Sequence, residues 1–350
     1  MQLGNSVQKA AIQKAFPAFC IAAAVAAASF AGTALAADEM EVKIGYYPGA
    51  TFHLPLYVAD AKGFYKQAGL KPTLIAVANG PLMNSQMGSG AIDFGHQPPS
   101  NVGLAREQGM DQVFVIGNVT MPWVLVAKKD LKVPNRGKYP DVIRDLKGLN
   151  WGVYGRGSDG EVFMRVMAGD AKLDVDKDMT WIAVGGPPTG LPALKAGRVD
   201  VYLTLAPAPT VVESLGYGTT ILDLRKGEGP GDFKGIHYNA IVTLRKTAQS
   251  KPRAVAAIVE ATTKAHCWLR KPENFNELLT IAKARLPVGE LSDKQFSDMI
   301  RENVPTFTPT MPASHFKTWN EMLLRAKVLK EAVPADKTLW KTVPEKEPAC

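Results

Sequence analysis

The feature that most constrains the fold of this chain is an internal repeat. Sliding the sequence against itself by 107 residues aligns residues 44–93 with residues 151–200 without a gap. Matching residues in the two copies include Gly45/Gly152, Tyr47/Tyr154, Thr73/Thr180, Ile75/Ile182, Ala76/Ala183, Val77/Val184, Pro81/Pro188, Gly90/Gly197 and Asp93/Asp200. A repeat of this length, with matches in matching structural roles, predicts two halves of similar fold.

Each copy has the pattern of a β-α-β-α-β unit. A short strand turns through glycine into a helix, and a Thr-x-Ile-Ala-Val run then predicts a buried parallel strand. A second, short helix stops at Gly90 or Gly197, where glycine suits a left-handed cap, and a last strand opens at Ile92 or Val199. We therefore predict an α/β fold with two lobes, each a mostly parallel sheet flanked by helices. Loops at the carboxyl ends of the strands would face a shared cleft.

A glycine triplet, Gly155-x-Gly157-x-x-Gly160, stands between strand and helix in the second copy. This context is typical of a dinucleotide-binding turn, which also needs an acid after the next strand. Here that strand runs into Gly185-Gly186-Pro187-Pro188 and has no such acid. The counterpart loop, YPGATFH, has no triplet but carries Thr51 where the second copy carries Ser158. We expect a tight, anion-facing turn at a helix start, or simple N-capping, and no nucleotide cofactor.

Composition narrows the range of partners. The formal net charge is +8, but the basic residues are scattered, so we expect no nucleic-acid partner. The five histidines lack ligand-like spacing, so we expect no metal site. After Pro252, helical periodicity predicts helices over residues 253–270, 275–286, 293–303 and 315–332.

Residues 1–36 have the pattern of a secretory signal peptide. They contain Lys9 and Lys14, no acid, an apolar run, and a final Ala34-Leu35-Ala36. We expect cleavage after about Ala36 and export to the periplasm, with an uncleaved membrane anchor as the alternative. The remaining cysteines, Cys267 and Cys350, allow either a disulfide or two free thiols.

Several stretches resemble one protein family: KIGYYPGATFHLPLYVADAKGFYKQAGLKPTL, NGPLMNSQMGSGAIDFGHQPPSNV, GRGSDGEVF and LPALKAGRVDVYLTLAPAP. From about residue 41 to 270 the chain is similar to the nitrate/sulfonate/taurine-type solute-binding proteins of ABC importers, which include thiamine-precursor binders. The resemblance implies a type II periplasmic-binding fold whose lobes close on a small anionic or zwitterionic organic solute. It implies delivery to a membrane permease and no enzymatic activity, and we expect a monomer. An aromatic carboxylate or a thiamine-pyrimidine precursor is the alternative solute.

The family's ligand-binding loops carry over to fourteen residues of this sequence, and Arg156, beside one of these loops, is a fifteenth candidate. They are Tyr47, Thr51, His53, Asn79, Gly80, His96, Gln97, Trp123, Arg156, Gly157, Ser158, Asp159, Pro188, His237 and Tyr238. Arg156 would supply a counter-charge to an anion or be a solvated surface residue. We expect Asp159 to turn away and favour the helix dipole; the alternative is contact with an amine or hydroxyl of the solute. Trp123 would stack on the solute or pack a hinge, whereas Trp151 and Trp181 are expected in the core.

The expected division places lobe 1 at residues 41–122 plus 236–333, lobe 2 at 123–235, and a tail at 334–350. The chain would cross between the lobes twice, which predicts a hinge. The competing hypothesis is an exported enzyme on the same fold. For it, Asp159 with His53 or His96 is the acid–base pair that the sequence offers.

Overall fold

The computed structural model describes residues 39–289 and 291–350. The predicted signal peptide, residues 1–36, lies outside this part of the chain. None of the helices formed by the described residues has both the length and the apolar character that crossing a membrane requires.

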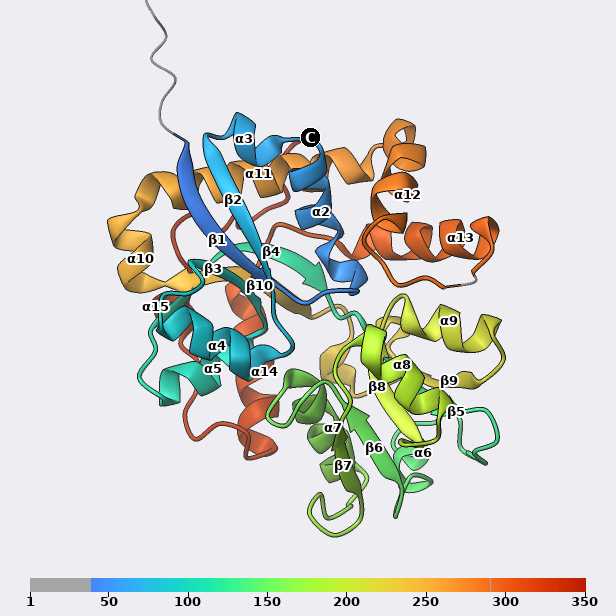
Figure 1. Cartoon of the computed structure of the whole chain (residues 1–350). Helices are drawn as coiled ribbons and strands as arrows, with labels where there is room; N and C mark the ends of the chain where they lie inside the picture. The colour runs from blue at the N-terminus through green and yellow to red at the C-terminus, as the bar shows by residue number, and fades with distance from the viewer. Residues whose placement is uncertain (1–38, 290) are drawn as a thin grey trace, which may run out of the picture. The chain divides into compact units, whose positions relative to one another are not determined.

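The first sheet has the strand order β2-β1-β3-β10-β4 (Figure 1). Strand β1 pairs in parallel with β2 and β3, whereas β10 pairs antiparallel with both β3 and β4. Four strands therefore point one way and β10 points the other. The strands are β1 (Met40–Tyr46), β2 (Leu70–Ala76), β3 (Phe94–Gln97), β4 (Gln112–Thr120) and β10 (His237–Leu244).

The second sheet repeats this arrangement with the order β7-β6-β8-β5-β9. Strand β6 is parallel to β7 and β8, and β5 is antiparallel to β8 and β9. The strands are β5 (Trp123–Lys128), β6 (Asn150–Val153), β7 (Thr180–Ala183), β8 (Val201–Leu205) and β9 (Gly218–Asp223). The predicted α/β fold with two similar sheets is confirmed, with one reversed strand in each.

Helices connect the strands and cover the sheets (Figure 1). The α-helices are α2 (Leu54–Ala61), α3 (Phe64–Gln67), α4 (Gly80–Gly88), α5 (Pro99–Glu107), α6 (Asp141–Arg144), α7 (Asp159–Asp170), α8 (Pro187–Lys195), α9 (Ala208–Ser214), α10 (Arg245–Ser250), α11 (Pro252–Arg270), α12 (Phe275–Lys283), α13 (Asp293–Asn303), α14 (Ala313–Arg325) and α15 (Ala335–Thr338). Short 3-10 helices are η2 (Thr51–His53), η3 (Leu224–Lys226), η4 (Gly231–Phe233), η5 (Pro272–Asn274) and η6 (Val304–Thr306). The four helices predicted after Pro252 correspond to α11, α12, α13 and α14.

The repeat is visible in individual hydrogen bonds. The carboxylate of Asp93 accepts the backbone N–H of Lys43 at 2.9 Å, and the carboxylate of Asp200 accepts that of Asn150 at 2.8 Å. Both donor and acceptor pairs are 107 residues apart. Each acid also pairs with a lysine, Lys251 or Lys128. Each aspartate thus joins the residue before β3 or β8 to the neighbouring strand, β1 or β6. Gly90 and Gly197 have φ of +79° and +69°, as their predicted cap role requires.

The apolar Thr-x-Ile-Ala-Val runs do not form buried strands, contrary to the prediction. Strands β2 and β7 lie at the edges of their sheets, and their residues are mostly half-buried or exposed. Trp151 is fully buried, but Trp181 on β7 is half-buried beneath the guanidinium groups of Arg156 and Arg165. An edge strand is covered less completely than a central one, so an apolar run alone did not determine burial.

The chain passes from the first sheet to the second after β4 and returns before β10. At these two crossings, the N–H of Met121 donates to the carbonyl of Ile236 at 2.9 Å. The crossing segments therefore lie side by side. The division into two lobes with a hinge here stays a prediction.

A disulfide joins Cys267 on α11 to Cys350, which settles the alternative left open by the sequence. The tail before Cys350 is also held by other contacts. The N–H of Trp340 donates to the carbonyl of Phe114 at 2.9 Å, and Glu347 pairs with Arg270 at 2.8 Å. The tail is therefore packed against β4 and α11.

The disulfide predicts a loss of stability on its removal. In Cys350→Ser the unfolded chain loses a cross-link closing a loop of 83 residues, so the free energy of unfolding should fall by about 2–4 kcal/mol. Denaturant unfolding of the oxidised protein measures this. Reductant should lower wild-type stability to a similar extent and leave Cys350→Ser unchanged. Equal stability of the variant and the oxidised wild type would contradict a cross-link in solution.

Candidate functional site

A narrow pocket lies between loops that follow strands of the two sheets. The space within it that the centre of a water molecule can occupy is about 10 Å³, which is close to the minimum for holding one water. One wall comes from the first sheet's side and the other from the second sheet's side. The lining residues are Tyr47, Phe52, Asn79, Gly80, Trp123, Tyr154, Ser158, Asp159, Leu205 and Tyr238.

The two walls use equivalent positions of the repeat. Tyr47 follows β1 and Tyr154 follows β6, and these residues are 107 positions apart. Phe52 in η2 corresponds in the same way to Asp159, the first residue of α7. The pocket is therefore built from duplicated loops, with an aromatic ring on one side where the other side carries a carboxyl group.

The glycine triplet allows close packing in this region. A Cβ on Gly155 would stand 2.9 Å from the Asn79 amide nitrogen of the opposite wall, and one on Gly160 would stand 3.4 Å from the Trp123 ring. Gly157 has φ of +72°, which favours glycine. Gly155 thus has a steric reason and Gly157 a conformational one, whereas a Cβ on Gly160 would make only an ordinary van der Waals contact with Trp123.

Asp159 lines the pocket, so the expectation that it would turn away is wrong. Only 9% of the residue is exposed, and its Oδ2 has no hydrogen-bond partner among the described residues. Burial raises the pKa of Asp159 to about 7, while the N–H groups of Asp159 and Gly160 at the helix start act in the opposite direction. The titratable groups that feel its charge are the buried phenols of Tyr47 and Tyr154. None of the described residues contributes a basic side chain to the pocket lining.

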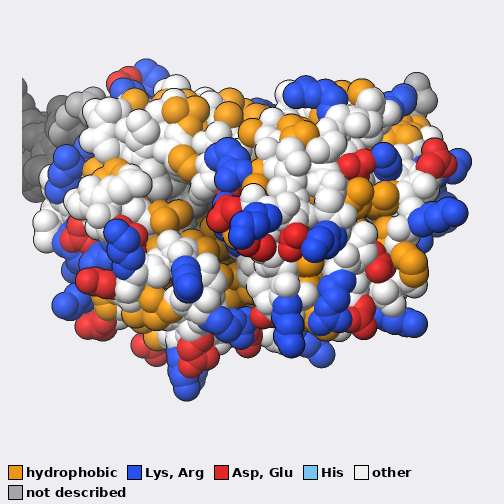
Figure 2. Space-filling view, turned by 90° about the horizontal axis from the view of Figure 1, so that it is seen from below, with side chains coloured by type: hydrophobic (Ala, Val, Ile, Leu, Met, Phe, Trp, Pro, Cys, Tyr) orange, Lys and Arg blue, Asp and Glu red, His pale blue; other side chains and the backbone are white. Residues whose placement is uncertain are grey.

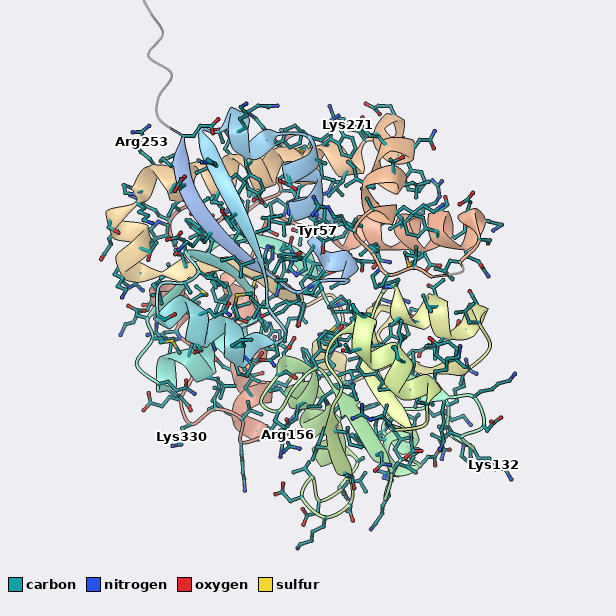
Figure 3. All side chains as sticks on the ribbon, in the orientation of Figure 1. Tyr57, Lys132, Arg156, Arg253, Lys271 and Lys330 are labelled. Carbon is teal, nitrogen blue, oxygen red and sulfur yellow. A yellow bond between two sulfur atoms is a disulfide. The ribbon has the colours of Figure 1, made fainter. Side chains whose placement is uncertain are left out.

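Arg156, the predicted counter-charge, lies outside the pocket on the surface (Figure 3). Its guanidinium pairs with Glu161 at 3.1 Å and lies 5.5 Å from the ring centroid of Trp181. Glu161 also pairs with Arg165 and accepts the N–H of Gly157. The arginine therefore braces the outer side of the turn, and its alternative role as a surface residue describes its position better.

Gln97 lies one layer behind the pocket and fixes parts of its wall. Its amide nitrogen donates to the carbonyl of Gly80 at 3.2 Å and to Asn84 at 2.6 Å. Its amide oxygen accepts the Tyr47 hydroxyl at 3.0 Å. This buried network positions Tyr47 and Gly80.

The three predicted site histidines do not line the pocket. His53 and His96 are fully buried with ring centroids 4.5 Å apart, and the Nε2 of His53 accepts the N–H of Tyr47 at 2.9 Å. Burial lowers the pKa of His53 well below its usual value and that of His96 to about 4. His237 contacts His315, with 2.9 Å between their Nδ1 atoms. The competing enzyme hypothesis pairs Asp159 with His53 or His96. Asp159 lines the pocket, but neither histidine does.

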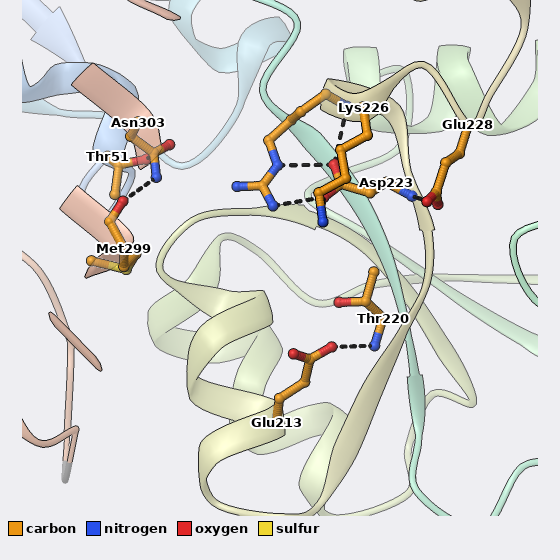
Figure 4. A network of polar contacts seen from close by, with 9 residues as sticks. Thr51, Glu213, Thr220, Asp223, Lys226, Glu228, Met299 and Asn303 are labelled. Carbon is orange, nitrogen blue, oxygen red and sulfur yellow. Dashed lines mark hydrogen bonds and ion pairs between the residues drawn. The ribbon is translucent and has the colours of Figure 1, made fainter. Parts of the chain in front are cut away.

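Thr51 and Pro188 also lie outside the pocket lining. The Thr51 hydroxyl donates to Asn303 on α13 at 3.4 Å, as Figure 4 shows. Its N–H donates to the carbonyl of Ala206, which follows β8 in the second sheet. Pro188 packs beside Gly49, where an added Cβ would stand 2.9 Å from the proline ring. These residues hold the two walls against each other.

The structure thus brings seven of the predicted residues to the pocket: Tyr47, Asn79, Gly80, Trp123, Ser158, Asp159 and Tyr238. Thr51, His53, His96, Gln97, Arg156, Gly157, Pro188 and His237 do not line it. The prediction missed Phe52, Tyr154 and Leu205. The repeat contained a signal for Tyr154, because it matches Tyr47. Phe52 aligns with Asp159 and could have been found in the same way.

A larger hollow of about 700 Å³ lies between α13 and the α9–β9 region. Several charged groups of this hollow pair with close neighbours: Arg225 binds Asp223 at 2.8 Å, and Glu213 accepts the N–H of Thr220 (Figure 4). These groups have partners already, unlike the Asp159 oxygen. We therefore take the pocket around Asp159 as the candidate site.

Surface charge and metal-ligating side chains can also mark a functional site. On the face in Figure 2, basic and acidic side chains are interspersed, without a large area of one sign. Within residues 39–289 and 291–350, no group of three or more His, Cys, Asp or Glu is placed to hold a metal ion.

The contact at Gly155 predicts that alanine is poorly tolerated there. Asn79 cannot easily move away, because its Oδ1 caps α4 by accepting the N–H of Leu82 at 3.0 Å. We expect Gly155→Ala to lower the free energy of unfolding by about 1–3 kcal/mol. The matched control is Gly169→Ala on α7, where the Cβ meets open space and helix propensity should raise stability. Denaturant unfolding compares the two; an equal effect would contradict close packing at Gly155.

Burial of Asp159 predicts a pH-dependent gain in stability for Asp159→Asn. A carboxyl whose pKa is raised by folding binds its proton more tightly in the folded chain. The stabilisation that the protonated Asp159 gives the folded chain is therefore present below about pH 4 and is lost as the pH rises towards 7. Asparagine carries no charge at any of these pH values. The free energy of unfolding of Asp159→Asn should therefore rise relative to wild type over this range, by about 2–4 kcal/mol at pH 8.

Unfolding at several pH values measures this difference, with the exposed Asp130→Asn as the matched control. A difference between Asp159→Asn and wild type that stays constant from pH 4 to pH 8 would contradict a raised pKa.

Three comparisons with known proteins bear on this site. A Brucella abortus (strain 2308) protein named as a binding protein is 26% identical over 174 residues, half of this chain and half of that protein. The chain thus spans about half the length of the curated relatives it matches first. The nitrate/nitrite binding protein NrtA of Nostoc sp. is 24% identical over 298 residues, covering 80% of this chain and 64% of that protein.

The fold is shared with the alkanesulfonate-binding protein SsuA of Xanthomonas axonopodis pv. citri, solved with bound MOPS. The TM-score is 0.67 at 17% identity, covering 87% of this chain and 99% of that chain. The architecture is thus that of the type II periplasmic-binding fold, as predicted. The family model described as NMT1/THI5 like matches residues 50–274, which include nine of the ten residues around the pocket and all five strands of the second sheet. The chain belongs to the NMT1/THI5-like family.

Proposed function

We propose that this chain is the exported solute-binding component of an ABC importer and captures a small organic solute in the pocket around Asp159. The observation that carries the proposal is the pocket itself: duplicated loops of two similar sheets converge on one largely aromatic space. Such a space, with few polar groups, is typical of small-molecule sites. The named relatives are binding proteins, which supports the same function here.

Binding by closure of two lobes agrees with the connections between the sheets. The chain crosses between them after Thr120 and before His237, and the crossings are joined by the Met121–Ile236 hydrogen bond. We propose lobes at residues 41–122 plus 236–333 and at 123–235, which rotate about these segments. A solute that touches both walls stabilises the closed arrangement over the open one.

The expected solute class is a small anionic or zwitterionic organic compound. The alkanesulfonate- and nitrate-binding relatives favour an anionic group. The pocket's single carboxyl and its lack of a lining base favour a zwitterion over a bare anion. The signal-peptide pattern supports export, and the disulfide agrees with an oxidising compartment.

Calorimetric titration of the purified protein tests the proposal. The panel contains taurine, alkanesulfonates, nitrate, aromatic carboxylates and aminopyrimidines. We expect saturable one-to-one binding of at least one compound, recovery of that compound unchanged, and a smaller radius of gyration in solution scattering.

Ser158→Ala should weaken the best binder by about tenfold, because Ser158 lines the pocket and its hydroxyl accepts the N–H of Gly155. The exposed Ser85→Ala on α4 is the matched control. Chemical conversion of the bound compound, or equal affinity in both variants, would count against a binding protein that uses this pocket.

A further inference from the structure

The charge inside the pocket differs from what a receptor for simple anions needs. Asp159 is the single charged residue among the lining residues, and its Oδ2 has no partner. A carboxylate next to a bound anion repels it, and the repulsion grows where water is excluded. The base that could offset this charge, Arg156, is engaged with Glu161 and Trp181 outside the pocket.

The orphaned oxygen lacks a hydrogen-bond donor. Burying a carboxyl group without a partner is unfavourable, and a ligand that supplies an N–H donor removes this disadvantage. Trp123, in the same lining, also has a buried ring N–H without a partner. Two polar groups in the second sheet's wall of the pocket, one acceptor and one donor, are therefore unsatisfied by the described residues.

The walls around this carboxyl are aromatic. Tyr47, Phe52, Trp123, Tyr154 and Tyr238 supply five rings. The ring of Trp123 meets Tyr154 and Tyr238 edge-on, with centroids 5.3 Å and 5.9 Å apart. Aromatic faces attract cations, and a carboxylate set among them adds a full opposite charge.

We propose that Asp159 makes the pocket selective for solutes that present a protonated amine, and that it disfavours otherwise similar anions without one. This inference rests on the proposed function and specifies the solute's chemistry. The amine donates to Oδ2 of Asp159 while the rings enclose the carbon adjacent to the nitrogen. Selectivity in the pocket is therefore set by one residue that occupies the position of Phe52 in the repeated loop.

The protonation state of Asp159 determines the pH range in which the pocket prefers amines. The groups that feel its charge, Tyr47 and Tyr154, are phenols with raised pKa values and stay neutral near pH 7. Asp159 is thus the group in this cluster that changes charge between pH 5 and pH 8. An amine favours the ionised form, so its binding near pH 7 should release a proton.

Two matched pairs of compounds test the proposal: taurine with isethionate, and benzylamine with benzyl alcohol. Within each pair a hydroxyl replaces the amine. At pH 8 we expect at least one amine to bind about tenfold or more tightly than its partner. The ratio should approach one at pH 5 and in Asp159→Asn, whose folding is checked by cooperative unfolding. For wild type, titrations in buffers of different ionisation enthalpy should show proton release at pH 7.

Tighter or equal binding of the hydroxyl compounds, or a preference for amines that persists in Asp159→Asn, would overturn the inference. Binding of isethionate without taurine would overturn it as well and leave the proposed function standing. Absence of binding by both amines also overturns it, and the proposed function fails only if the wider panel of sulfonates, nitrate, carboxylates and aminopyrimidines is silent too.

Discussion

The structure around the site depends on a carboxyl group held between two protein walls without a counter-charge. Asp159 is placed there by the start of α7, whose N–H groups partly offset the effect of burial on its pKa. The turn before this helix can approach the opposite wall because Gly155 has no Cβ to meet Asn79. The close approach at Gly155 and the buried carboxyl of Asp159 thus occur in the same turn. Unpaired buried charges are disfavoured in a structural core, so this placement is a sign of function.

Much of the fold could be predicted because the same contacts form in both copies of the repeat. Asp93 and Asp200 were visible as a matched pair, and each binds the same N–H position of its first strand. Strand order was harder to predict. Strands β5 and β10 lie outside the aligned segments 44–93 and 151–200, so the repeat held no information on the reversed strand in either sheet. The apolar runs of β2 and β7 predicted buried strands, although the sheet order leaves both at the edges.

The site could be predicted to the level of loops but not of side-chain direction. Thr51 and Ser158 align in the repeat, yet Thr51 contacts Asn303 on α13, a helix without a repeated counterpart. The Arg156 side chain similarly pairs with Glu161, which also accepts the N–H of Gly157. His53 and His96 pack against one another inside the first sheet's half. In each case a partner that no local pattern reveals decides where the side chain points.

The narrowness of the pocket has a consequence for how a solute enters. A cavity with room for about one water cannot admit an organic molecule while the walls keep their present contacts. The contacts that must be released first join the two sides: the Thr51 N–H with the Ala206 carbonyl, and the Asn79 side chain against Gly155. The two sides also touch through apolar contacts, such as Pro188 beside Gly49 and the ring of Phe163 on α7 against Trp319 on α14, whereas the chain stays continuous through the crossing segments at Met121 and Ile236. Under the proposed two-lobe closure, the loops would separate while the crossings stay in place, which would expose Asp159 to water. The solvated carboxylate of this proposal ionises more readily, so an approaching amine would meet a charged partner before the walls close.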